Sequence, residues 1–266
     1  MDNPFSYTPG HSPLLISMPH PGLQLTPAVE QGLVDEAKNL ADTDWHIPRL
    51  YDFAHGLGAH VLAAQYSRYV VDLNRPADNT PLYSGNTTGL YPETLFDGRP
   101  LFKPGATPSA DARAQYLAGI WQAYHQRLAQ TLAAIKAEHG YALLWDAHSI
   151  RAEVPHLFDG QLPDFNLGTH SGASCDPALA QRLEALCASN PAFSHVLNGR
   201  FKGGYITRAY GQPGQDVHAV QLELTQRNYM DETPPFAYRD DLAGPTRALI
   251  QQLLEAFLAW GRERYR

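Results

Sequence analysis

Two histidines in this sequence stand where a buried β-strand is expected to end. His20 follows the apolar run 14–17, and His148 comes shortly after the apolar run 141–145. In open α/β sheets, ligands bind beyond the carboxyl ends of the strands, so both side chains are expected to border one crevice. Neutral imidazole is a common ligand of divalent metal ions. The pair therefore indicates a metal site, and the alternative interpretation is that both are hydrogen-bonded structural histidines.

A catalytic zinc site with two histidines calls for a carboxylate as its third ligand. Such sites typically combine three protein ligands with one open position for water or substrate. The acidic candidates are Asp42, Asp44, Asp72, Asp146 and Glu223. Asp42 or Asp44 could instead cap the helix expected to follow them. Asp146 lies two residues before His148 and points the same way on a pleated strand, so it could orient a histidine ligand from behind.

Glu223 lies inside a strand predicted over residues 218–224. The apolar residues of this strand share one face, which leaves Gln221 and Glu223 together on the other face. A carboxylate with such apolar flanks is either paired or functional. A general base beside a metal site needs a carboxylate whose pKa suits work near neutral pH, and Glu223 is the candidate for this role.

Arginines form a further signal. Arg68 and Arg75 lie at opposite ends of a strand predicted over 69–73, and Arg200 belongs to a glycine-rich stretch. The guanidinium group binds carboxylates through two parallel hydrogen bonds, so these side chains could hold an anionic substrate. In a chain of formal charge −7, the alternative is a set of ordinary surface ion pairs.

The elements that must position these residues follow an α/β pattern. Short β-rich runs alternate with helical periodicity over residues 1–266, which predicts a single domain with a sheet covered by helices. Strands are expected at 14–17, 60–64, 69–73, 141–145, 195–197 and 218–224. Helices are expected from Pro27 with Thr26 as its cap, over 47–57, over 116–135, after Asp176 and over 242–265. Residues 76–108 show no periodicity, and we interpret them as a long loop near the site.

Composition limits the function classes. The negative net charge argues against nucleic acid or an anionic membrane as a partner. The sequence lacks a signal peptide, a membrane-spanning run and a disulfide framework, which favours a cytoplasmic location. Nucleotide-binding glycine motifs and the serine-hydrolase elbow are also missing. The expected partner is a small molecule, and the sequence indicates no oligomeric state.

Five motifs, taken in chain order, resemble the N-formylglutamate amidohydrolase family. They occupy residues 17–22, 42–45, 67–75, 146–149 and 223–230. The resemblance extends from about residue 12 to the last helix. It implies a zinc-carboxypeptidase-like α/β hydrolase with a mixed, mostly parallel sheet between helices. The implied reaction is hydrolysis of N-formyl-L-glutamate to formate and L-glutamate, the last step of one bacterial route of histidine degradation.

The resemblance also implies roles for individual residues. His20 and His148 would bind one divalent metal ion, with zinc preferred and cobalt or manganese as alternatives. Glu223 would be the catalytic carboxylate. Zinc carboxypeptidases take their first two ligands from His-x-x-Glu, but Leu23 stands three residues after His20. The carboxylate ligand is therefore expected from Asp44, with Asp42 as the reserve.

The remaining assignments concern the substrate and the surroundings of the metal. The residues expected to contact the small dianionic substrate are Arg68, Asn74, Arg75 and Arg200, and those expected behind the ligands are Asp146 and Gln226. Two other functions stay open at this point. One is a deacylase or carboxypeptidase with a different substrate, and the other is a non-catalytic module that binds carboxylates.

Overall fold

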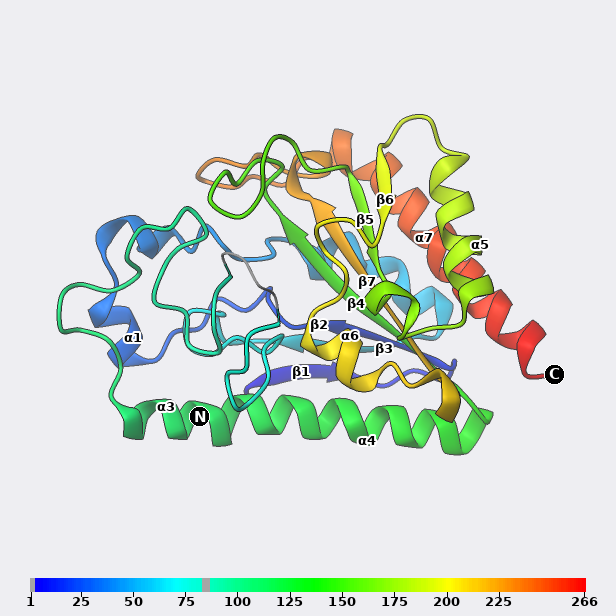
Figure 1. Cartoon of the computed structure of the whole chain (residues 1–266), viewed down its shortest axis with the longest axis horizontal. Coiled ribbons are helices and arrows are strands. Elements are labelled where there is room, and N and C mark those ends of the chain that lie inside the picture. The colour runs from blue at the N-terminus through cyan, green and yellow to red at the C-terminus, as the bar shows by residue number, and fades with distance from the viewer. Residues whose placement is uncertain (1–2, 83–86) are drawn as a thin grey trace.

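The computed structural model describes residues 3–82 and 87–266, and within them seven strands form one sheet in the order β1-β3-β2-β4-β7-β5-β6 (Figure 1). The strands are β1 (Phe5–Thr8), β2 (Leu14–Met18), β3 (His60–Ala64), β4 (Ala142–Ile150), β5 (Phe165–Gly168), β6 (His195–Leu197) and β7 (Val217–Thr225). The pairs β1–β3 and β5–β7 are antiparallel, and the other neighbours are parallel. The predicted α/β fold with a mixed, mostly parallel sheet is confirmed.

Helices cover both faces of this sheet. They are α1 (Pro27–Gly32), α2 (Ile47–Leu50), α3 (Ala110–Tyr116), α4 (Gln122–His139), α5 (Pro177–Ala188), α6 (Tyr205–Tyr210) and α7 (Asp240–Arg264). In Figure 1, α4 runs along one side of the sheet, while α5 and α7 lie on the opposite side. No helix of the described residues is long and apolar enough to cross a membrane.

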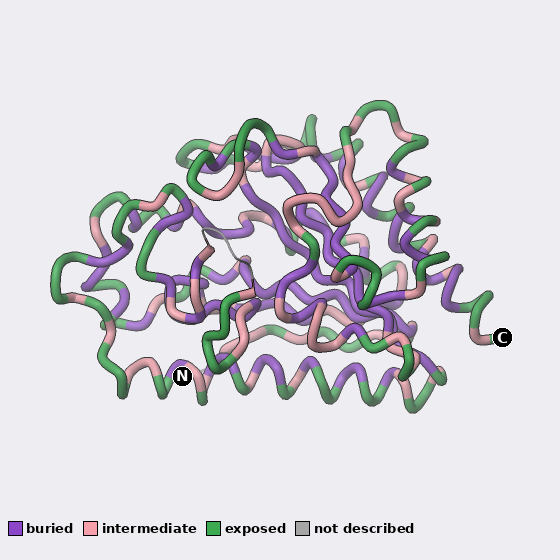
Figure 2. The backbone as a smooth tube through the Cα atoms, in the orientation of Figure 1, coloured by how far each residue is buried: buried purple, intermediate pink, exposed green. Residues whose placement is uncertain are grey.

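The side chains of each central strand alternate between two apolar cores. Trp145 of β4 packs in the core that contains Phe257 of α7, whereas its neighbour Leu144 packs in the core that contains Tyr124 and Leu128 of α4. Figure 2 shows the central strands buried along their length, with exposed residues mainly on the outer helices and loops. Burial on both faces explains why β4 reads as a continuous apolar run before Asp146.

The structure corrects three of the expected elements. Residues 69–73 are irregular rather than a strand. The Asp72 backbone N–H donates to Leu90 O, and the apolar residues before Asp72 pack from a loop into the core that contains Tyr124 and Leu128. The helix expected over 47–57 ends at Leu50 and gives way to a 3₁₀ turn. Strand β4 runs on to Ile150 because β7 pairs with it to that point, so Asp146 and His148 lie within the strand and not after it.

Other differences are smaller. Helix α1 begins at Pro27 as expected, but Thr26 makes no side-chain cap and instead bonds to the Tyr116 hydroxyl. Asp176 does cap α5, through the backbone N–H of Ala178. Strands β1 and β5 and helix α6 were not expected, since each is too short to show a period. The described part of the loop 76–108 has no helix or strand, and residues 83–86 lie outside the description.

Candidate metal centre and substrate pocket

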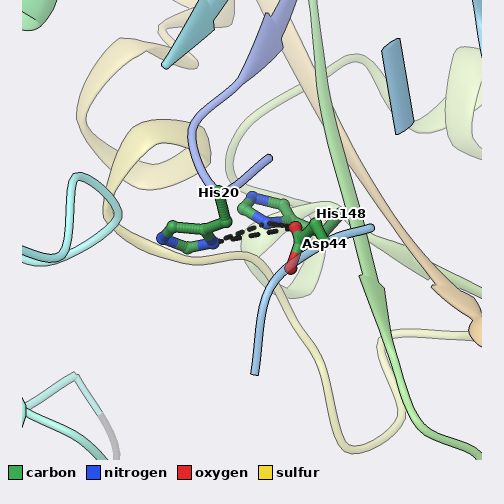
Figure 3. A group of neighbouring side chains, drawn as sticks. All are labelled: His20, Asp44 and His148. Carbon is green, nitrogen blue, oxygen red and sulfur yellow. Dashed lines mark hydrogen bonds and ion pairs between the residues drawn. The ribbon is translucent and has the colours of Figure 1, made fainter. Parts of the chain in front are cut away.

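The histidines predicted as metal ligands come from two neighbouring parallel strands. β2 pairs with β4, so His20, two residues beyond β2, lies beside His148 of β4. Asp44 reaches the same place from the loop before α2, where its backbone N–H donates to His20 O at 3.1 Å. Figure 3 shows the three side chains converging. All three are buried, and they are the group that could hold a metal ion in the described residues.

The ligand atoms have the spacing that a metal ion requires. His20 Nδ1 lies 3.2 Å from His148 Nδ1, His148 Nδ1 lies 3.1 Å from Asp44 Oδ2, and His20 Nδ1 lies 3.7 Å from that oxygen. Tetrahedral zinc with bonds of 2.0–2.1 Å separates its ligands by about 3.3 Å. The trio therefore fits a divalent ion held by one nitrogen of each histidine and one carboxylate oxygen.

The other ring nitrogens of both histidines face carboxylates. His20 Nε2 lies 2.8 Å from Asp72 Oδ1, and Asp72 Oδ2 accepts a bond from Arg68 Nη2 at 2.7 Å. His148 Nε2 lies 3.1 Å from Asp146 Oδ2. A carboxylate behind a histidine fixes the ring orientation and leaves the opposite nitrogen free of its proton for metal binding. Asp146 thus lies where the sequence placed it, and Asp72 occupies the equivalent position behind His20.

Charges within the cluster shift several pKa values. Burial alone would raise the pKa of Asp44, but hydrogen bonds from His148 and His20 outweigh burial and hold the pKa below its usual range. Burial opposes ionisation of Asp72 in the same way, and Arg68 with His20 lowers its pKa well below normal. The site therefore gathers ionised carboxylates around two histidines in a buried place, a setting that favours a cation.

Asp42, the reserve ligand, points elsewhere. One of its oxygens accepts bonds from the Tyr69 hydroxyl and the Phe96 backbone N–H, and the other lies 3.3 Å from Arg151 Nη2. It does not belong to the metal-binding group. One residue of an irregular loop, Thr43, separates Asp42 from Asp44, and their side chains enter different surroundings.

Glu223 lies next to His148 across the β4–β7 pairing and borders the pocket beside the trio. Its Oε2 accepts a hydrogen bond from Gln221 Nε2 at 3.2 Å, so both side chains lie on one face as the sequence predicted. Burial raises the pKa of Glu223 to about 8, and the neighbouring charges of His148 and Asp44 have smaller, opposing effects. A carboxylate poised in this range can take up and release a proton near neutral pH.

The pocket contains about 580 Å³ of space not filled by atoms, and all three predicted arginines line it. Arg75 Nε donates to Thr88 O at 2.7 Å, and Arg200 Nε donates to Leu157 O at 3.0 Å. Arg68 also borders the pocket, although its Nη2 is engaged by Asp72.

Asn74 lines the pocket too, whereas Gln226 lies deeper. Asn74 Nδ2 lies 3.0 Å from His148 Nε2, while its Oδ1 accepts from Ile206 N–H. Gln226 Nε2 donates to Thr43 O at 2.9 Å, so it contacts the loop that carries Asp44 and not the side chain of a metal ligand.

Sequence reasoning missed Asp72 as the partner of His20. The four-residue spacing of Arg68 and Asp72 was a usable signal, but the strand expected over 69–73 obscured it.

Comparison with known proteins adds evidence on the family of this chain. The model of the N-formylglutamate amidohydrolase family matches residues 12–230. The chain is 71% identical over 265 residues to the N-formylglutamate deformylase of Pseudomonas aeruginosa, with 100% of both chains covered. The chain belongs to the N-formylglutamate amidohydrolase family. It is also 63% identical to the N-formylglutamate deformylase of Pseudomonas putida, covering 100% of this chain and 99% of the relative.

Solved structures share the fold. An N-formylglutamate amidohydrolase from Ralstonia eutropha superposes with a TM-score of 0.81 at 21% identity, and 98% of each chain is covered. A protein from Agrobacterium tumefaciens gives a TM-score of 0.74 at 14% identity, covering 96% of this chain and 94% of the other. The family membership predicted from the five motifs is confirmed, and the trio and pocket described above are this amidohydrolase's candidate active site.

Proposed function

We propose that this chain hydrolyses N-formyl-L-glutamate to formate and L-glutamate with the help of one divalent metal ion, preferably zinc. The convergence of His20 Nδ1, His148 Nδ1 and Asp44 Oδ2 at ligand-like separations carries the metal assignment. The curated relatives, which match over their full length, carry the substrate assignment. Cobalt and manganese suit a similar ligand set and stay alternatives.

A divalent ion at the trio would act as a Lewis acid, favouring ionisation of water and stabilising negative charge on the formyl oxygen. Glu223 borders the same pocket and acts as the general base and then the general acid. It accepts a proton from the water that attacks the formyl carbon. It returns this proton to the glutamate nitrogen as the C–N bond breaks, which yields formate and L-glutamate. A divalent ion at the trio would place positive charge near Glu223 and favour its ionised, proton-accepting form.

The arginine side of the pocket binds the two carboxylates of the substrate. Arg75 and Arg200 line the pocket and are oriented by bonds to backbone carbonyls. Asn74 Nδ2 lies 3.0 Å from His148 Nε2, and Arg68 bonds to Asp72 behind His20, so these two side chains contact the part of the substrate nearest the reacting amide. The two guanidinium groups can each bind one carboxylate through paired hydrogen bonds, so together they match a substrate with two negative charges. N-formyl amino acids with apolar side chains lack the second carboxylate and bind less well.

A formate-release assay on zinc-loaded enzyme tests this proposal. N-formyl-L-glutamate should be the preferred substrate, and N-formyl-L-norleucine, which lacks the second carboxylate, should show a raised KM. Release of amine from N-acetyl-L-glutamate should be much slower if the space beside the trio fits only the formyl group. Equal activity on the acetyl compound would indicate a general deacylase, and inactivity on every compound would contradict enzymatic function.

Three finer assignments belong to the same proposal. The kinship with zinc carboxypeptidases, the place in histidine degradation and the cytoplasmic location stay predictions from the sequence. The two buried free cysteines, Cys175 and Cys187, are compatible with a reducing compartment.

A further inference from the structure

Asp44 differs from the other proposed ligands in having no strand to hold it. His148 lies within β4 and His20 directly follows β2, but Asp44 lies on an irregular stretch between Leu40 and α2. The residues at both limits of this stretch, Leu40 and His46, have left-handed backbone conformations. A ligand on such a loop needs support from elsewhere in the fold if its oxygen is to stay in place.

The support comes from the two carbonyl groups that flank Asp44. Gln226 Nε2 donates to Thr43 O at 2.9 Å, and the Tyr229 hydroxyl donates to Trp45 O at 2.8 Å. Both donors belong to the segment directly after β7, which carries Glu223. The main chain is therefore bonded immediately before and immediately after the ligand residue.

Ser149 joins the two donors to β4. Its Oγ lies 2.7 Å from the Tyr229 hydroxyl and 3.4 Å from Gln226 Nε2. Because a carbonyl oxygen can only accept, the one phenol proton goes to Trp45 O, and the Ser149 hydroxyl must donate to Tyr229. Gln226 has a second amide proton, which is directed at Ser149. The three side chains thus form one network that begins next to the ligand His148.

These three side chains are almost inaccessible, and they remain neutral. Tyr229 is 0% exposed, and Ser149 and Gln226 are each 2% exposed. Buried hydrogen bonds of this kind hold a loop more firmly than exposed ones, because no water can replace a lost partner. The loop is further packed by Phe236, whose ring stacks on Trp45 and whose carbonyl bonds to His46 Nε2.

We propose that Ser149, Gln226 and Tyr229 form a clamp that positions Asp44 and thereby sets the affinity of the site for its metal ion. The clamp residues are positioning residues, because they act through the loop. This inference rests on the proposed metal centre. It assigns Ser149 and Tyr229 a positioning role; Ser149 also borders the pocket, whereas Tyr229 does not line it.

The test is titration of metal-free enzyme with Co²⁺, whose visible absorption reports ligand geometry. In Tyr229→Phe and Ser149→Ala, the Co²⁺ affinity should fall about tenfold or more, in the range seen when support behind a ligand is removed. The absorption bands should shift as the carboxylate moves. Excess Co²⁺ should restore kcat for N-formyl-L-glutamate, with KM unchanged, whereas a merely structural loss would not respond to metal. Because both residues belong to one network, the double variant should lose less than the sum of the single losses.

Tyr51→Phe is the matched control. Tyr51 is also buried, and its hydroxyl accepts a bond from Trp145 Nε1 at 2.9 Å; among the described residues it makes no hydrogen bond to the loop 43–45. Unfolding of the metal-free variants should show comparable losses of stability for Tyr51→Phe and Tyr229→Phe, while Co²⁺ affinity falls only in the latter. If Tyr229→Phe and Ser149→Ala bind Co²⁺ within about twofold of the control and with the same bands, the clamp proposal is wrong.

Failure of the metal centre would look different from failure of the clamp. Wild-type enzyme that takes up no Co²⁺ at the trio would overturn the metal assignment itself, and the clamp with it. If Tyr229→Phe does not fold, Ser149→Ala decides the question alone, since it removes the bridge to β4 and keeps both bonds to the loop carbonyls.

Discussion

The two halves of the pocket are held in different ways. In the metal half, the two histidines lie on or beside strands and bond to carboxylate side chains, His20 to Asp72 and His148 to Asp146, while Asp44 lies on a loop. In the arginine half, side chains bond to backbone carbonyls of loops, as Arg75 does to Thr88 O. The metal half is almost fully buried, whereas Arg75 and Arg200 are half-buried.

This difference separates two tasks. Reacting groups must hold their geometry to a fraction of an ångström, and the buried carboxylates behind the two histidines restrict the histidine rings in this way. Groups that select the substrate must admit it and release it, and these lie on the loop side of the pocket. Substitutions in the metal half should therefore change kcat or metal affinity, and substitutions in the arginine half should change KM.

The largest expected effect is at Glu223. Glu223→Gln keeps the shape of the side chain but removes proton transfer, so kcat should fall about 100- to 10,000-fold. Zinc content should be unchanged because Glu223 is not in the ligand group. Glu232→Gln, an acid outside this pocket, is the control. A loss smaller than about tenfold would contradict the assignment of Glu223 as the base.

Next in size is the effect of removing the carboxylates behind the histidines. Asp72→Asn and Asp146→Asn should each weaken zinc binding by about 10- to 100-fold, as measured by competition with a chelator. The loss should be larger for Asp72, which has the shorter bond and also pairs with Arg68. Asp42→Asn, a buried acid that touches no ligand, should leave zinc affinity unchanged. Equal losses for Asp42 and Asp72 would show a general effect of buried charge.

A smaller effect is expected in the arginine half. Arg75→Gln and Arg200→Gln should each raise KM for N-formyl-L-glutamate about tenfold, because each variant loses one hydrogen bond between a charged guanidinium group and a substrate carboxylate. The kcat and the zinc content should change little. One of the two variants should leave KM for N-formyl-L-norleucine unaffected, which would identify the arginine that binds the side-chain carboxylate. Arg239→Gln, at a partly exposed arginine outside the pocket, is the control. Unchanged KM in both variants would remove these residues from substrate binding.

The last prediction concerns stability and not kinetics, and it involves a buried histidine that supports the chain just before Asn74. His125 Nε2 donates to Leu73 O, directly before Asn74, and burial lowers the pKa of His125 to about 4. In the unfolded chain, the His125 ring takes up a proton near pH 6.5. Above that pH the ring is neutral in both the folded and the unfolded chain, so the folded chain has its full stability there. Stability should be lost as pH falls from 6.5 to 4, by about 3 kcal/mol in total. Urea unfolding of wild type and His125→Gln should show it, with a flatter pH dependence in the variant. Parallel curves would contradict the assignment.

The sequence predicted the metal half better than its supports. His20 and His148 could be found because histidines near the carboxyl ends of buried strands are expected to meet at one edge of a parallel sheet. The choice between Asp44 and Asp42 could not be made from spacing, because it depends on how an irregular loop bends. The resemblance and the absence of Glu at position 23 favoured Asp44, and the structure places Asp44 in the trio.

The supporting residues were harder to predict. The run at 69–71 is apolar and β-branched enough to look like a strand, and only its tertiary packing makes it a loop that turns Asp72 toward His20. Ser149 and Tyr229 show no pattern at all, since their partners lie about 80 to 180 residues away in the chain. Long-range hydrogen bonds of this kind follow from the fold and carry no local signature.

Removal and stepwise return of the metal test the central claim most directly. The enzyme is stripped with a chelator, zinc is added back in known amounts, and formate release from N-formyl-L-glutamate is measured at each step. Activity should be absent without metal and should rise to a plateau at one zinc per chain, and His148→Ala should not recover at any zinc level. Full activity of verified metal-free enzyme would contradict the account.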